Sequence, residues 1–164
     1  MAFSPAKKYY TPAEALGRTK KYCAFQERSH SEVRSKLLTL GIRGNDLENV
    51  MVKLIEGGFL NEERFAKAYA GGKFRIKHWG RKRIENQLAA EGVSTYCINK
   101  ALQEIDDRDY RQSLFKLLKT KEALLKEKNI FRKKQKLSEF LIRKGYEAEL
   151  VWQEVNNYLS DSSE

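Results

Sequence analysis

Apolar residues recur along most of the chain at intervals of three and four, which places them on one face of an α-helix. The pattern can be aligned on three glycines, Gly41, Gly92 and Gly145. Eight residues before these glycines the chain has Val33, Ile84 and Leu137, and four residues before them it has Leu37, Leu88 and Leu141. The positions one, six, ten and thirteen residues after each glycine are also apolar. They are Ile42, Leu47, Met51 and Leu54 after Gly41, Val93, Ile98, Leu102 and Ile105 after Gly92, and Tyr146, Val151, Val155 and Tyr158 after Gly145. The pattern repeats three times, roughly every 50 residues, and predicts an all-α chain.

Residues that begin and end helices divide the chain at the same places. Thr11, Pro12 and Glu14 predict a reciprocal capping box, and Ser29 with Glu32 predicts a second one. Further N-caps are expected at Asp46 and Asn61, and glycines that end helices in the left-handed conformation at Gly41, Gly57-Gly58, Gly92 and Gly145.

Each repeat also has room for a helix before the aligned pair, at 12–27, 62–78 and 107–128. We therefore expect three tandem three-helix repeats, at 11–60, 61–106 and 107–160. A unit of roughly 50 residues has a marginal core, so consecutive units should share buried surface and form an elongated curved array. Gly71-Gly72, inside the second of these helices, predicts a kink or a close helix crossing.

Composition narrows the classes of protein that fit. The 164 residues are 41% hydrophobic and carry a net charge of +10, which favours a folded protein with a polyanionic partner. Cys23 and Cys97 have no zinc-ligand or disulfide spacing, so we expect no metal and no cofactor. Residues 1–10 lack the apolar run of an export signal and no stretch is long enough to cross a membrane, so a cytoplasmic location is expected.

Two segments concentrate the positive charge. From 73 to 83 the chain has no acid and interleaves aromatic residues with cations, a composition suited to phosphate contact and base stacking. From 111 to 136 lysine and arginine outnumber acids ten to two. The alternative in each case is a solvated face around core residues such as Phe74 and Trp79. The candidate binding residues are Lys73, Arg75, Lys77, Trp79, Arg81, Lys82, Arg83, Lys126, Lys128, Arg132, Lys133, Lys134 and Lys136.

No residue pattern predicts catalysis. His30 and His78 stand apart from any serine, cysteine or carboxylate that would form a catalytic group. The stretch from Gly71 to Phe74 lacks the hydroxyl that a phosphate-binding loop needs. Acid pairs such as Glu62-Glu63 lie where helices begin and are explained by the helix dipole. We expect that the protein is not an enzyme.

Three motifs together resemble one known family. They are Ser29-x-x-Glu32-Val33-x-x-Lys36-Leu37-x-x-x-Gly41, then Gly58-Phe59-Leu60-Asn61-Glu62-Glu63-Arg64-Phe65-Ala66, then Gly80-x-x-Arg83-Ile84-x-x-x-Leu88-x-x-x-Gly92-Val93. The chain resembles the RecX family over roughly residues 14–159, and the middle motif is the most specific. Gly80-Arg81 stands where the family often has Gly-Pro, and the third repeat is unusually rich in lysine.

The resemblance implies a fold and a function. It implies a crescent of three three-helix units that regulates the RecA recombinase in homologous recombination, DNA repair and the SOS response. The protein would bind the recombinase filament on single-stranded DNA and inhibit its ATPase, strand-exchange and coprotease activities, with duplex DNA as a further ligand. We expect a monomer, because no long coiled-coil seam is present.

Two other functions fit the same residues. A basic helical module could bind DNA without a recombinase partner, and its affinity would then fall steeply with salt. An interaction scaffold would instead use both basic segments only for solubility.

Overall fold

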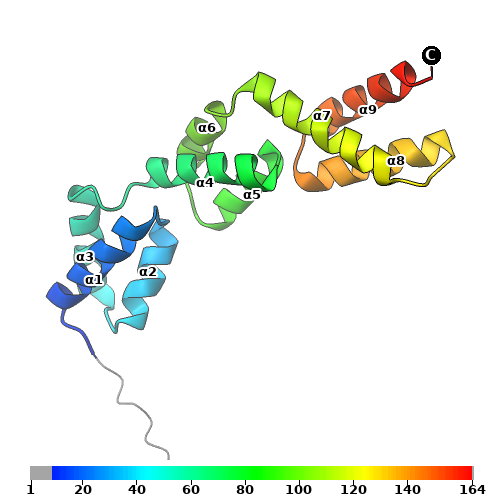
Figure 1. The fold of residues 1–164 in the computed structure, drawn as a ribbon. Helices are drawn as coiled ribbons and strands as arrows, with labels where there is room; N and C mark the ends of the chain where they lie inside the picture. Colours follow the sequence, from blue (N-terminus) through cyan, green and yellow to red (C-terminus); the bar gives the residue numbers. More distant parts are fainter. Residues whose placement is uncertain (1–8, 164) are drawn as a thin grey trace, which may run out of the picture.

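The computed structural model describes residues 9–163, and the earlier prediction about residues 1–10 falls almost entirely outside this range. Within it the chain forms only helices: α1 Pro12–Phe25, α2 His30–Thr39, α3 Gly44–Glu56, α4 Glu62–Lys77, α5 Arg81–Ala90, α6 Thr95–Gln103, α7 Asp107–Leu124, α8 Ile130–Lys144 and α9 Ala148–Asp161. Figure 1 shows α1–α3 at one end, α4–α6 in the middle and α7–α9 at the other end of a bent, elongated molecule. The predicted all-α repeat array is confirmed.

Most helix starts lie where their capping side chains predict them. Thr11 with Glu14 and Ser29 with Glu32 both form complete capping boxes. Asn61 caps α4. The prediction for Asp46 is wrong: α3 begins at Gly44, so Asp46 lies in the first helical turn, where its charge still suits the helix dipole.

The aligned apolar positions form the buried face of the repeats. Val33, Ile84 and Leu137 are fully buried, and so are Leu37, Leu88 and Leu141. Of the positions that follow the glycines, all are buried except Leu102 and Tyr158, which are partly buried. The prediction from periodicity is therefore confirmed, because a side chain that returns to the same helix face meets the same neighbouring helices.

The helix expected at 107–128 is shorter than predicted. The α7 helix ends at Leu124, and Leu125 has an extended backbone. Asn129 then caps α8 by accepting a hydrogen bond from the Arg132 N–H. The residues between the two helices therefore form a connecting loop.

The buried residues fall into two clusters. One lies within α1–α3, from Ala15 to Leu60, and the other extends through α4–α9, from Phe65 to Leu159. Polar contacts join the two parts, including an ion pair between Arg64 and Glu27 and a hydrogen bond from Ser29 to Glu91. The expected sharing of buried surface is thus found between α4–α6 and α7–α9, whereas α1–α3 has its own cluster. The division at 60/61 and 106/107 stays a prediction.

The glycine pair in α4 does not mark a close crossing at Gly72. A Cβ atom built there would have no neighbour within 4 Å, and one built at Gly71 would meet first the Arg75 guanidinium of the same helix.

We therefore expect Gly72→Ala to raise the free energy of unfolding by about 1 kcal/mol, since alanine restricts the unfolded chain and favours the helix. Urea unfolding followed by circular dichroism measures this change. A lower stability would show that position 72 is more crowded than the structure indicates.

Candidate nucleic-acid and protein interface

Two turns from distant parts of the chain meet backbone to backbone. The α4–α5 turn at 78–80 lies against the α8–α9 turn at 145–147, and together they are called the junction below. The Gly80 N–H donates to the Lys144 carbonyl at 2.9 Å, and the Lys82 N–H donates to the Gly145 carbonyl at 2.9 Å. A Cβ atom at Gly80 would lie 2.2 Å from the carbonyl carbon of Gly145. Only glycine allows this approach, so the junction fixes α5 relative to α8.

Two buried tyrosines complete the junction from α7 and the α8–α9 turn. The rings of Tyr110 and Tyr146 pack with their centroids 4.9 Å apart. The Tyr110 hydroxyl accepts from the Arg81 N–H at 3.0 Å and donates to Glu147 at 2.7 Å. The Tyr146 hydroxyl donates to the His78 carbonyl at 3.1 Å. Burial raises the pKa of both tyrosines, so the hydroxyls stay protonated and can donate these bonds at neutral pH.

Arg81 belongs to the junction rather than to its exposed surface. Its guanidinium lies 4.0 Å from the centroid of the Tyr110 ring. It also donates to the Ile105 carbonyl at 3.3 Å and to Asp107 at 2.5 Å, and its side chain is 24% exposed. These contacts leave Arg81 less available to a partner than its neighbours in the sequence.

Trp79 lies half-buried between two cations of the same predicted site. The Arg83 guanidinium is 4.2 Å from the indole centroid, and the Lys73 ammonium is 5.0 Å from it. The left-handed backbone of His78, with φ of 56°, turns the chain so that Trp79 reaches this position. Lys73 and Arg83 therefore cover part of the Trp79 ring. That part of the ring is not open to the stacked base that the sequence predicted.

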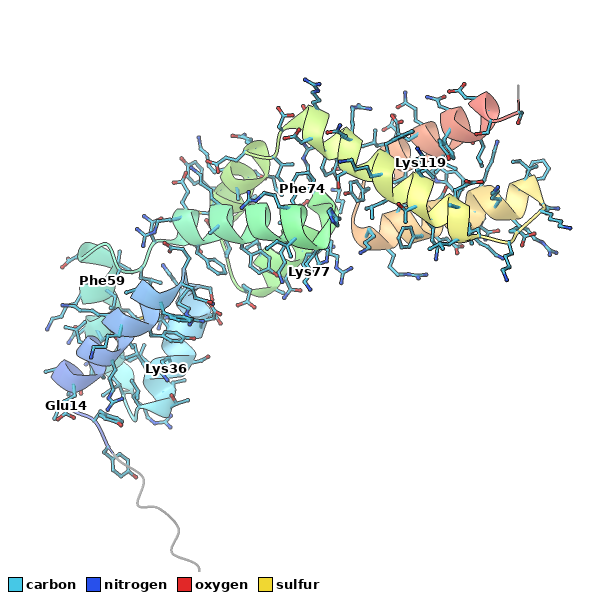
Figure 2. The ribbon with its side chains drawn as sticks, viewed as in Figure 1. Glu14, Lys36, Phe59, Phe74, Lys77 and Lys119 are labelled. Atoms are coloured by element: carbon cyan, nitrogen blue, oxygen red, sulfur yellow. The ribbon has the colours of Figure 1, made fainter. Side chains whose placement is uncertain are left out.

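The exposed cations of the first basic segment lie around the junction. Arg75 and Lys77 are exposed on the last turns of α4, and Lys82 and Arg83 are exposed on the first turn of α5. Figure 2 shows Lys77 at this end of α4, together with Phe74. The structure thus brings most of the segment 73–83 onto one region of the molecule.

Two hollows open beside the junction. A groove of about 280 Å³ runs between α5 and α8 and is lined by Lys82, Arg83, Asn86, Gln87, Ile142, Arg143 and Gly145. A cleft of about 430 Å³ between α4 and α7 is lined by Phe74, Arg75, His78, Asp109, Gln112, Ser113, Lys116, Leu117 and Thr120. Arg143 and Lys116 were not among the predicted binding residues. Both are exposed, and their positive charge was the only signal in the sequence that could have indicated them.

The candidate residues of the second basic segment, 126–136, lie apart from the junction. They occupy the loop after α7 and the beginning of α8, whereas the junction is at the other end of α8 (Figure 1). The helix has 15 residues, so roughly 22 Å separates its two ends. Lys133 pairs with Glu122 at 2.6 Å and Lys136 with Glu127 at 2.9 Å. The candidate residues therefore form two separate surfaces.

The described residues contain no candidate metal site and no candidate membrane-spanning helix. No group of three or more histidine, cysteine or acidic side chains between residues 9 and 163 could hold a metal ion. The same stretch contains no helix with the length and apolar character that a membrane crossing needs.

Comparisons with known proteins agree with the fold and the motifs. Residues 61–102 match the family model described as RecX, second three-helix domain. The regulatory protein RecX of Clostridium perfringens strain 13 is 33% identical over 122 residues, which are 73% of this chain and 57% of that protein. The regulatory protein RecX of Clostridium tetani is 30% identical over 141 residues, which are 83% of this chain and 62% of that protein. This chain thus spans less than two thirds of these relatives.

The structural similarity extends over most of the chain. The crystal structure of RecX from Lactobacillus salivarius superposes with a TM-score of 0.81 and 20% identity, covering 91% of this chain and 96% of that one. At this identity the likeness shows the fold. The sequence relatives and the matching family model establish that the chain belongs to the RecX family.

Proposed function

We propose that this protein binds the RecA recombinase filament on single-stranded DNA and inhibits its ATPase, strand-exchange and coprotease activities. The observation that carries the proposal is the basic surface around the junction of a RecX-family chain. There Lys82, Arg83 and Arg143 line one groove, and backbone contacts between Gly80 and Gly145 fix their positions. The relatives are named regulatory proteins, and the absence of catalytic activity is part of the proposal.

The shape of the molecule supports this function. A filament presents the same surface at regular intervals, so an elongated array of helical repeats can contact neighbouring subunits and gain avidity from several weak contacts. The cations can approach DNA phosphates or acidic protein surface, with release of counterions. A monomeric state and a cytoplasmic location belong to the same proposal.

The decisive experiment measures the single-strand-dependent ATPase of preformed recombinase filaments while this protein is titrated far below one molecule per DNA site. Inhibition at such low ratios supports filament regulation, because one molecule then affects many recombinase subunits. Inhibition only when the DNA is saturated contradicts it and favours a DNA-binding module that acts without the recombinase. Binding to bare DNA is measured alongside.

The groove beside the junction gives a sharper test. We expect the double variant Lys82→Ala and Arg83→Ala to need about tenfold more protein for half-inhibition of the ATPase. It should also lower the salt dependence of single-strand binding by about 0.7 per lost phosphate contact, on a logarithmic scale. Arg81 is left intact, because its contacts to Tyr110 and Asp107 are structural.

A matched control removes the same charge elsewhere. Arg43→Ala with Lys53→Ala takes two exposed cations from α3 and its N-cap, far from the junction. This control should leave inhibition unchanged. Equal losses in both double variants would show that only net charge matters and would remove the groove from the proposal.

A further inference from the structure

Large apolar side chains are exposed on both sides of the loop between α7 and α8. Phe131 is 78% exposed, Leu124 is 73% exposed and Ile130 is 43% exposed. None of the three belongs to either buried cluster or to the partly buried residues packed against one. Together with the cations between 126 and 134 they form the end of α7, the loop and the first turn of α8, which is called the distal tip below. Apolar side chains gathered on an exposed surface commonly mark a contact with a partner.

The acids nearest this tip are already paired. Glu122 accepts from Lys133 at 2.6 Å, and Glu127 accepts from Lys136 at 2.9 Å. The Lys136 contact, with the Asn129 N–H, holds the pKa of Glu127 below its usual range, so this carboxylate stays charged and engaged. Within the described part of the chain no ion pair involves Lys126, Lys128, Arg132 or Lys134. These four cations of the distal tip can therefore meet a partner, whereas Lys133 is engaged by Glu122.

We propose that the distal tip binds single-stranded nucleic acid, with a base stacked on the Phe131 ring and the flanking phosphates held by Lys128 and Arg132. Arg132 follows Phe131 directly, Lys128 precedes it by three residues, and Lys134 comes one helical turn later. An exposed aromatic ring among cations is the arrangement that binds single strands without sequence preference. The proposal rests on the proposed function, because the strand is the one within the filament.

The form of the tip favours a strand over a protein partner. The loop between α7 and α8 lies at the protruding end of this helix pair (Figure 1), and the three apolar residues flank that loop. A protein partner would need a matching hollow for them, whereas a flexible strand can bend around a protrusion and present a base from either side. The tip and the junction lie roughly 22 Å apart along α8. One strand could therefore contact both surfaces.

The test compares three full-length variants in fluorescence polarisation with a labelled oligodeoxythymidylate. Phe131→Leu keeps an apolar side chain and removes the ring, and it should weaken binding about tenfold, as expected for the loss of one stacked base. Phe131→Trp should restore the affinity. Phe25→Leu is the matched control, since Phe25 is 83% exposed at the last residue of α1. The α1 helix lies well away from the loop between α7 and α8 (Figure 1), so this variant should bind as the unchanged protein does.

The possible results of this test distinguish nucleic-acid binding by the distal tip from inhibition of the recombinase filament. Equal affinity of Phe131→Leu and the unchanged protein for the oligonucleotide would overturn the proposal. So would a Phe131→Leu variant that loses ATPase inhibition but binds the oligonucleotide normally, because the tip would then contact protein. If the unchanged protein binds the oligonucleotide through Phe131 but never inhibits the recombinase, the tip assignment stands and the proposed function fails. Phe131 is exposed, so circular dichroism should show the same helix content for all variants.

Discussion

Replacing Gly80 by alanine should lower the free energy of unfolding by at least about 3 kcal/mol, because the new methyl group has no space. It would lie 2.2 Å from the carbonyl carbon of Gly145 and 2.3 Å from the Tyr146 nitrogen. Both are backbone atoms, which cannot rotate away as a side chain can. The φ of Gly80 is −77°, an angle that alanine adopts freely. The loss of stability therefore comes from the steric clash with the backbone of Gly145 and Tyr146 alone.

Urea unfolding followed by circular dichroism measures this loss, and Gly17→Ala is its control. Gly17 lies in α1, and a Cβ atom there would meet nothing within 4 Å. That variant should be about 1 kcal/mol more stable than the unchanged protein, as expected for Gly72→Ala. The Gly80→Ala variant should also bind single strands less well, since the junction positions Lys82, Arg83 and Arg143. A Gly80→Ala variant of normal stability would show that the two turns do not stay in contact in solution.

Truncating Leu37 or Leu88 to alanine should cost about 2 to 5 kcal/mol each, but in different parts of the molecule. The two residues occupy the same position in successive repeats, and both are fully buried. Leu37 belongs to the cluster of α1–α3, and Leu88 belongs to the cluster of α4–α9. The cavity left by each truncation should therefore destabilise the helices around it and leave the other cluster intact.

Native-state hydrogen exchange distinguishes the two variants. Leu37→Ala should speed exchange in α1–α3 only, whereas Leu88→Ala should speed it throughout α4–α9. Leu38→Ala is a control for the first variant, because Leu38 is the neighbouring leucine and lies at the surface. If Leu37→Ala speeds exchange in α8 and α9 as much as in α1–α3, the two clusters unfold as one unit and the separation inferred from the structure is wrong.

The binding surface could be read from the sequence only in part. The charge of the segments 73–83 and 126–136 was evident, because the first has cations and no acid and the second has six cations and one acid. The contacts that these cations make with other residues of the fold were not evident. Arg81 stacks on Tyr110, and Lys133 pairs with Glu122, through folding that periodicity does not describe. Arg143 joins Lys82 in one groove although the two lie far apart in the sequence.

Most helices could be predicted from local residues. Capping boxes such as Thr11 with Glu14, and apolar stripes such as Val33 with Leu37, act within one or two turns, so local residues suffice to predict them. The way in which the repeats join depends instead on contacts between distant parts of the chain. The contact of Gly80 with Gly145 and the bond from Tyr146 to His78 connect residues more than sixty positions apart. Such contacts depend on how whole helices pack, and no local pattern records them.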